Sequence, residues 1–134
     1  MVVVAAVIVR EGRILVCQRS RKDSFPLKWE FPGGKVKSGE TPTAALVREL
    51  REELGVGATI GAEVFRTRHK YAQMKDDVEL IFYRANLEGA KVQNLVFEAI
   101  EWSEPAALPA KDFLEADKGL IERLANGDGT VPRG

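Results

Sequence analysis

The chain has 134 residues and a mass of 14.8 kDa, which is the size of a single domain. Its 20 lysines and arginines balance 20 aspartates and glutamates, which excludes the basic excess typical of proteins that bind nucleic-acid polymers or membrane surfaces. The single cysteine, Cys17, excludes an intramolecular disulfide and fits a reducing compartment, so we expect a cytoplasmic protein.

The first two predicted elements are strands that form a hairpin. Residues 2–9 are apolar and rich in β-branched side chains, which predicts a strand covered on both faces. This run is too short to span a membrane, and no basic segment precedes it as in a secretory signal. Glu11 and Gly12 predict a tight turn into a second strand, residues 13–18, with Cys17 in the core.

A helix is predicted in the middle of the chain. Residues 19–28 are basic and aperiodic, which predicts a loop, and the following run WEFPGG contains a Pro-Gly-Gly break that neither a helix nor a strand would tolerate internally. Thr41 is suited to cap a helix, Pro42 to occupy its first position and Gly55 to follow its end.

The second half of the chain alternates strands and helices. The pattern predicts strands at residues 64–68, 78–84 and 99–103, a short helix beginning at Glu104-Pro105, and a final helix at residues 113–124. We therefore expect one α/β domain over residues 1–126, followed by a flexible tail at residues 127–134.

Three carboxylates share one face of the central helix. Glu49, Glu52 and Glu53 stand at positions i, i+3 and i+4, away from the apolar stripe that includes Leu50 and Leu54. The helix alone leaves two interpretations open: an ordinary acidic surface, or a site that binds a cation.

The surrounding residues follow a fixed spacing. The segment reads Gly34, five residues, Glu40, seven residues, Arg48-Glu49-Leu50, one residue, Glu52-Glu53, one residue and Gly55-Val56. This spacing resembles the Nudix box at every position. The flanking run WEFPGGK and the pair Gln18-Arg19 are similar to the MutT branch of that family. The resemblance implies the Nudix fold, a mixed β-sheet sandwiched between α-helices, and hydrolysis of nucleoside triphosphates to monophosphate and pyrophosphate.

The resemblance also implies a divalent metal, Mg²⁺ with Mn²⁺ as an alternative. A polyanionic triphosphate needs a hard cation with oxygen ligands to offset its charge. Glu52, Glu53 and Glu49 are the implied ligands, together with the backbone carbonyl of Gly33. Glu49 is also the implied general base, although that role and the role of third ligand can be exchanged.

Two further residues of the box have supporting roles by the same resemblance. Arg48 is expected to orient the acids through a charge-assisted hydrogen bond, and Glu40 to assist it. One position departs from the family, because many relatives carry a metal-binding glutamate six residues before the tryptophan that corresponds to Trp102. Val96 stands there, so either Glu98 replaces it or the site uses fewer protein ligands.

Asp117 is the residue that the resemblance places against the base. An ionised aspartate only accepts hydrogen bonds, which favours the exocyclic amine of cytosine or adenine, or the N7–H of 8-oxoguanine; guanine O6 would need a protonated Asp117. The alternative is an aspartate that only stabilises a helix N-terminus. For the phosphates we consider Arg19 and Lys35, and Phe82 either stacks on the base or packs in the core.

The first function hypothesis is a Mg²⁺-dependent hydrolase of oxidised or non-standard nucleoside triphosphates such as 8-oxo-dGTP, which serves nucleotide-pool sanitation. The alternatives are a (d)CTP-type pyrophosphatase, an ADP-ribose or nucleotide-sugar hydrolase, and a silent domain that senses nucleotides. The expected partner is a small nucleotide, not a nucleic-acid polymer or a membrane, and monomer and homodimer both fit.

Overall fold

The computed structural model describes residues 1–72 and 74–127. Apart from Gly127, the tail predicted at residues 127–134 therefore lies outside the described residues. Within the described part, no helix has the length and apolar character needed to cross a membrane.

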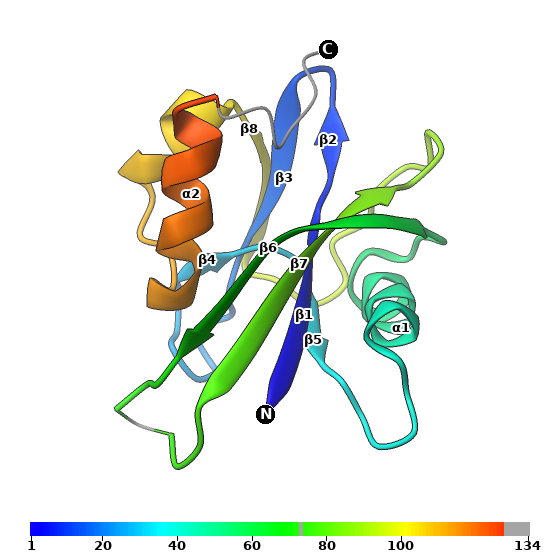
Figure 1. Ribbon diagram of the computed structural model, residues 1–134. Helices are drawn as coiled ribbons and strands as arrows, with labels where there is room; N and C mark the ends of the chain where they lie inside the picture. The colour runs from blue at the N-terminus through cyan, green and yellow to red at the C-terminus, as the bar shows by residue number, and fades with distance from the viewer. Residues whose placement is uncertain (73, 128–134) are drawn as a thin grey trace.

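A mixed sheet of four strands forms the centre of the molecule (Figure 1). Its order is β5 (Gly33–Lys35), β1 (Val2–Val7), β7 (Val78–Asn86) and β6 (Thr59–His69). β1 runs parallel to β7 and antiparallel to β5, and β6 runs antiparallel to β7. The predicted mixed sheet is confirmed.

The second sheet contains the predicted hairpin. Its strands are β2 (Val9–Arg10), β3 (Arg13–Gln18), β4 (Trp29–Glu30) and β8 (Ala99–Ser103). The single strand predicted at residues 2–9 is wrong in one respect, because the chain leaves the first sheet at Ile8 and enters the second. The Ile8 carbonyl accepts the N–H of Leu15 at 3.0 Å where the chain crosses.

The central helix α1 (Pro42–Leu54) has the predicted ends. The Thr41 hydroxyl accepts the N–H of Ala44 at 3.2 Å, which satisfies one of the free donors of the first turn. Gly55 follows the last turn with a φ of 67°, a left-handed conformation that glycine adopts without a steric penalty.

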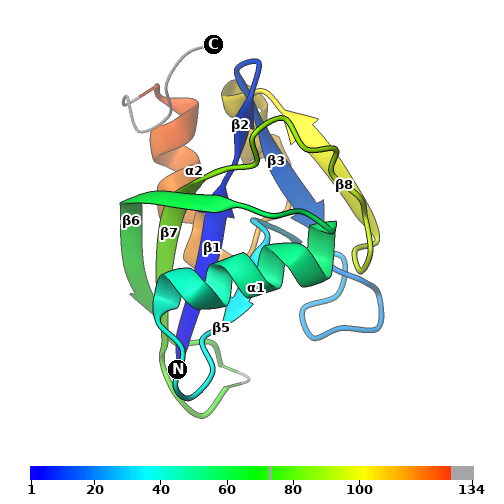
Figure 2. The same ribbon diagram turned by 90° about the vertical axis from the view of Figure 1, so that its right-hand side faces the viewer.

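The two α-helices cover opposite faces of the first sheet, as the resemblance implied (Figures 1 and 2). Alternate residues of β1 enter the two cores. Val4 and Ala6 pack in the core that contains Leu46 and Leu50 of α1. Ala5 and Val7 pack in the other core, which contains the apolar face of α2 (Lys118–Ala125). This alternation explains why β1 is apolar on both faces.

Four elements differ from the prediction in extent or type. The last helix is shorter, because a 3-10 turn, η2 (Glu115–Asp117), precedes α2. β7 extends two residues beyond the predicted end. β6 is longer than predicted, since irregularities in its register between Ile60 and Phe65 interrupt its alternation. The short helix predicted at Pro105 is the 3-10 helix η1 (Pro105–Ala110).

Candidate active site

A cavity of about 380 Å³ opens at the N-terminal ends of the parallel strands β1 and β7. Loops that leave the second sheet, one face of α1 and the turn before α2 complete its walls. The ionisable side chains that line it come from all of these elements: Arg19, Asp23, Glu30, Lys35, Glu49, Glu53, Tyr71 and Asp117. The fold thus brings the acidic face of α1 and the predicted base-reading residue to one cavity.

Glu53 of α1 contacts Gly33, the first of the two adjacent glycines Gly33 and Gly34. The Gly33 N–H donates to Glu53 Oε1 at 3.0 Å. A Cβ at Gly33 would lie 2.0 Å from the Val4 carbonyl oxygen, and its φ is 156°, so only glycine fits between β1 and the acid. Burial, followed by the nearby Glu49 and Glu30 carboxylates, raises the pKa of Glu53 to about 9.

Glu49 lies against the second glycine. A Cβ at Gly34 would lie 2.5 Å from Cδ of Glu49, so the carboxylate occupies the space that any other side chain would fill. Arg48 Nη1 donates to Glu49 Oε1 at 2.8 Å and fixes the carboxylate from the opposite side. The position of this acid is therefore set by backbone on one side and a cation on the other.

Arg48 connects the acids, as predicted for the box. Its Nε and Nη2 form a bidentate pair with Glu40 at 2.7 and 2.9 Å, and this hydrogen bonding lowers the pKa of Glu40 to about 2. Nη1 also reaches Glu52 at 3.3 Å, and Nη2 donates to the Lys35 carbonyl at 3.1 Å. All three nitrogens of the guanidinium group are thus used in holding the α1 acids to the loop that precedes the helix.

Two predicted ligands lie away from the cavity lining. The Glu52 side chain is 55% exposed and does not line the cavity. Glu98 pairs with Arg21 at 3.1 Å, and its neighbours Val96 and Phe97 line the cavity in its place. Across residues 1–72 and 74–127, no group of three or more acidic, histidine or cysteine side chains is arranged to hold a metal.

The donor set nevertheless fits a hard divalent cation. The carboxylates of Glu49 and Glu53 line the cavity together with Gly33, whose carbonyl is the predicted backbone ligand. All of these donors are oxygens, which Mg²⁺ and Mn²⁺ prefer. After burial, the nearby Glu49 and Glu30 carboxylates contribute to the raised pKa of Glu53, and a bound cation relieves that repulsion.

Asp117 also lines the cavity. Its side chain is 3% exposed, and its buried Oδ2 has no hydrogen-bond partner in the described part of the chain. Burial, with the Glu30 carboxylate, raises the pKa of Asp117 well above its ordinary value. Asp117 stands at the N-cap position of α2, as the helix-terminus alternative requires, and its side chain makes no capping hydrogen bond there. The Tyr71 hydroxyl accepts the Ala116 N–H at 3.1 Å and fixes the turn that carries Asp117.

Arg19 lines the cavity, and each of its three side-chain nitrogens makes one hydrogen bond within the protein. Its Nη1 pairs with Glu30 at 3.0 Å, its Nε donates to the Ser24 carbonyl at 2.7 Å and its Nη2 to the Ser24 hydroxyl at 3.1 Å. The side chain therefore holds the loop of residues 19–28 against β4. Sequence reasoning missed Glu30, whose signal was an acidic residue between the two aromatic residues Trp29 and Phe31. Lys35 lines the cavity mouth and is exposed.

Phe82 is placed in the core and not in the cavity. It is fully buried and packs edge-to-face on Phe31, with ring centroids 5.6 Å apart. The prediction that it stacks on a base therefore fails, because no part of its ring reaches the cavity. The aromatic residues that do line the cavity are Phe25, Phe31, Tyr71 and Phe97, and the ring centroids of Phe25 and Tyr71 lie 4.8 Å apart.

Comparison with known proteins gives a consistent result. The NUDIX domain model matches residues 1–124. The chain is 55% identical over 120 residues to a CTP pyrophosphohydrolase from Escherichia coli, with 90% of this chain and 87% of the relative covered. It is 38% identical over 125 residues to an 8-oxo-dGTP diphosphatase from Haemophilus influenzae, with 92% and 90% covered.

Solved structures agree with this assignment. The solution structure of the E. coli ORF135 protein is 33% identical and superposes with a TM-score of 0.82 over 99% of this chain and 94% of the other. The domain match spans nearly the whole chain, and the box residues meet in one cavity. The chain therefore belongs to the Nudix hydrolase family, in its MutT-like branch.

Proposed function

We propose that the protein is a Mg²⁺-dependent pyrophosphohydrolase that cleaves nucleoside triphosphates, with oxidised purine nucleotides such as 8-oxo-dGTP as the first candidate substrates. The observation that supports this most is the placement of Glu49, Glu53 and Asp117 in one cavity. One end of this cavity suits a metal and phosphates, and the other end suits a base. Sanitation of the nucleotide pool is the role that such an activity serves, and the cytoplasm is the compartment that fits the buried, unpaired Cys17.

The acidic end suits the phosphates. Glu53, Glu49, Glu52 and the Gly33 carbonyl would hold the cation, Mg²⁺ or Mn²⁺, whose charge offsets that of the triphosphate and lowers the pKa of a bound water. Glu49 is the group we assign to accept the proton of the attacking water, because Arg48 and the Gly34 backbone fix its carboxylate. The exposed Lys35 ammonium at the mouth suits the outer phosphates.

Glu52 and Arg19 need separate roles. The exposed Glu52 carboxylate completes the ligand set only by turning toward the cavity, where it would give up its 3.3 Å contact with Arg48. Arg19 acts by positioning the Glu30 carboxylate and the loop of residues 19–28, because all three of its side-chain nitrogens donate to these groups. Glu98 is not assigned to the metal, because its side chain lies outside the cavity lining and pairs with Arg21.

The opposite end suits a base edge with one donor and one acceptor. A neutral Asp117 carboxyl group donates through its O–H and accepts through its C=O, as an asparagine amide does. In 8-oxoguanine the N7–H donates and O6 accepts, so both atoms of the carboxyl group are satisfied. In guanine N7 and O6 both accept, and one of these contacts is lost. A buried site with an unmet polar group discriminates strongly against such a base.

A CTP-type substrate is the second candidate. The cytosine edge also presents one donor, N4–H, beside one acceptor, N3, and it fits the same neutral carboxyl group. The 55% identity to the E. coli CTP pyrophosphohydrolase favours this alternative specifically. The two candidates differ in ring size and not in hydrogen-bond pattern, so direct comparison of rates decides between them.

The test is pyrophosphate release from a panel of dCTP, dGTP, 8-oxo-dGTP and ADP-ribose with Mg²⁺ and with Mn²⁺. We expect release from 8-oxo-dGTP or dCTP, with no turnover in Glu53→Gln. Glu122→Gln on the exposed surface of α2 is the matched control and should retain full activity. No product from any triphosphate with either metal would overturn the proposal, and preference for ADP-ribose would favour the nucleotide-sugar alternative.

A further inference from the structure

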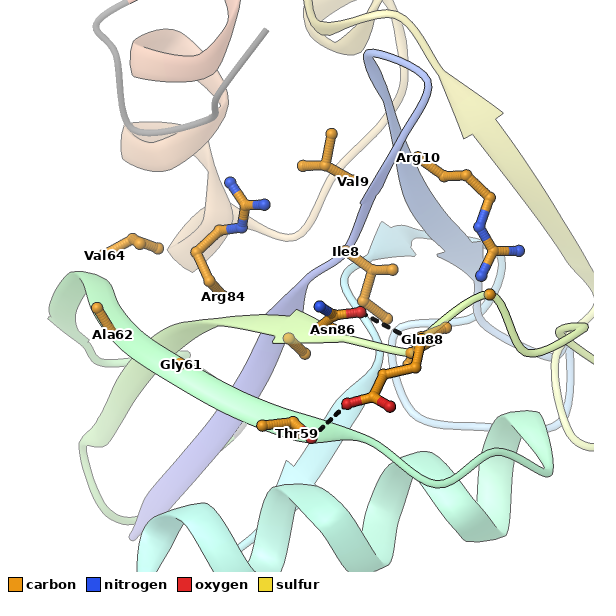
Figure 3. A pocket seen from close by; sticks show the side chains of 13 residues that line it. Ile8, Val9, Arg10, Thr59, Gly61, Ala62, Val64, Arg84, Asn86 and Glu88 are labelled. Atoms are coloured by element: carbon orange, nitrogen blue, oxygen red, sulfur yellow. Dashed lines mark hydrogen bonds between the residues drawn. The ribbon is translucent and has the colours of Figure 1, made fainter. Parts of the chain in front are cut away.

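A second cavity, of about 590 Å³, lies at the opposite end of β7 from the candidate active site (Figure 3). It exists because β1 pairs with β7 only as far as Val7 and Arg84. Beyond that point the chain turns at Ile8 into the second sheet, whereas β7 continues to Asn86 paired only with β6. The gap between the diverging strands is the cavity.

Arg84 is the side chain in this cavity that lacks a partner. In the described part of the chain it makes no hydrogen bond or ion pair, and its Nε is inaccessible to solvent with no acceptor. Burial lowers the pKa of Arg84, although an arginine remains charged in any case. A half-buried guanidinium without an acceptor is costly, so a ligand that supplies oxygens is favoured here.

The other cation of the cavity is already used. Arg10 Nη2 donates to the Ala90 carbonyl at 2.9 Å, and its guanidinium lies 5.1 Å from the centre of the Trp102 ring. In Figure 3 the Arg10 and Arg84 side chains point away from each other, on either side of the chain at Ile8 and Val9. Arg84 is therefore the group that remains for an anion.

The remaining lining limits what that anion can be. Glu88 contributes one negative charge and is held to the Thr59 hydroxyl at 3.4 Å, on the far wall from Arg84 in Figure 3. This carboxylate disfavours a dianion such as a phosphate monoester. Beside the Arg84 guanidinium, Figure 3 shows the apolar side chains of Val9 and Val64. The lining fits a single negative charge on an apolar body.

We infer that this cavity binds a small carboxylate with an apolar substituent, whose two oxygens form an end-on pair with the Nη1–H and Nη2–H groups of Arg84, since Nε is inaccessible. The planar guanidinium and the planar carboxylate match in this geometry. The inference is independent of the proposed hydrolysis, because no residue of this cavity lines the candidate active site.

The test follows the Nε–Hε signal of Arg84 by nuclear magnetic resonance while isovalerate is added at constant ionic strength. We expect a saturable shift with a millimolar dissociation constant, as suits a ligand of this size, and a smaller response to acetate. The neutral analogue isovaleramide and inorganic phosphate should produce no saturable shift.

Variants separate the Arg84 site from a general charge effect. With binding followed by the signals of neighbouring amides, Arg84→Met should weaken it about ten-fold or more. Arg84→Lys should restore little of it, because an ammonium lacks the fork. Arg68→Met removes the same charge from an exposed site outside the cavity and should leave binding unchanged. Pyrophosphate release by all three variants would report that the fold is intact.

Three results would overturn the inference. The first is no shift with isovalerate, and the second is an equal response in Arg84→Met and in wild type. The third is a signal that moves with protein concentration and not with isovalerate, because the oxygens would then come from a second copy of this chain.

Discussion

A methyl group at Gly34 should displace the Glu49 carboxylate without straining the backbone. The added Cβ would lie 2.5 Å from Glu49 Cδ, whereas ordinary contact begins at 3.4 Å, so the carboxylate must retreat by about 0.9 Å. Gly34 has no positive φ, and Glu49 is a flexible side chain, so we expect the free energy of unfolding to fall by about 1 kcal/mol at most. A misplacement of this size in a catalytic group costs about 100-fold, which is the loss of kcat we expect for Gly34→Ala.

Gly33→Ala is the matched comparison at the neighbouring position. Its Cβ would lie 2.0 Å from the Val4 carbonyl oxygen and 2.7 Å from the Ala5 Cα, both of which are backbone atoms of β1. Neither can move without breaking the pairing of β1 with β5, so we expect this variant to lose about 3 kcal/mol or more of stability.

The assay is pyrophosphate release under saturating substrate, alongside urea unfolding followed by circular dichroism. We expect the two variants to separate: Gly34→Ala loses activity but has an unfolding midpoint close to that of wild type, whereas Gly33→Ala loses both activity and stability. Wild-type kcat in a folded Gly34→Ala would refute the assignment of Glu49, because the reaction would then tolerate a displaced carboxylate. An activity loss in Gly34→Ala that only tracks a lower unfolding midpoint would refute the steric argument.

Three other substitutions test the remaining assignments. Arg48→Ala should lower kcat about 100-fold because it releases the carboxylate of Glu49. Arg48→Lys should not restore kcat, since one ammonium group cannot replace three hydrogen-bonding nitrogens. Recovery of kcat in the lysine variant would contradict this. Asp117→Asn should gain stability over wild type as the pH rises from about 4 to about 7. Because the folded state has the raised pKa, above about pH 4 the unfolded state releases a proton that the folded state retains, so wild type loses stability as the pH rises, whereas asparagine does not titrate. A difference between urea midpoints that is flat with pH would refute this. Glu98→Gln should change kcat less than about 3-fold, because its carboxylate pairs with Arg21 outside the cavity; a 100-fold loss would restore it as a metal ligand.

The central helix was predictable from sequence because its signals are local. Thr41 and Gly55 each act through backbone groups within one turn, so their residue types alone indicate where the helix begins and ends. The spacing of Arg48 and the acids on that helix likewise determines which side chains meet, and the structure contains the predicted hydrogen bonds.

Features that depend on tertiary contacts were not predictable in this way. The apolar run at residues 2–9 has no period, so it carried no mark of the break at Ile8, where the chain changes sheets. Phe82 alternates with its neighbours as predicted, but alternation does not distinguish a residue under the cavity from one that lines it. Leu80, on the same face of β7, lines the cavity and Phe82 does not. In the sequence, Arg84 is only the polar residue at the end of a predicted strand. That its Nε has no hydrogen-bond partner depends on where β1 diverges from β7, which the sequence does not show.

The passage of the chain through Ile8 also constrains the order in which the domain can fold during synthesis. β1 emerges from the ribosome before every element that covers it, and its parallel partner β7 is complete only at Asn86. The core on one face of β1 is complete only when α2, which ends at Ala125, has been synthesised. A strongly apolar segment is thus left without its native neighbours until nearly the whole domain has been made. Such non-local pairing slows folding and leaves apolar surface of the nascent chain exposed in the meantime.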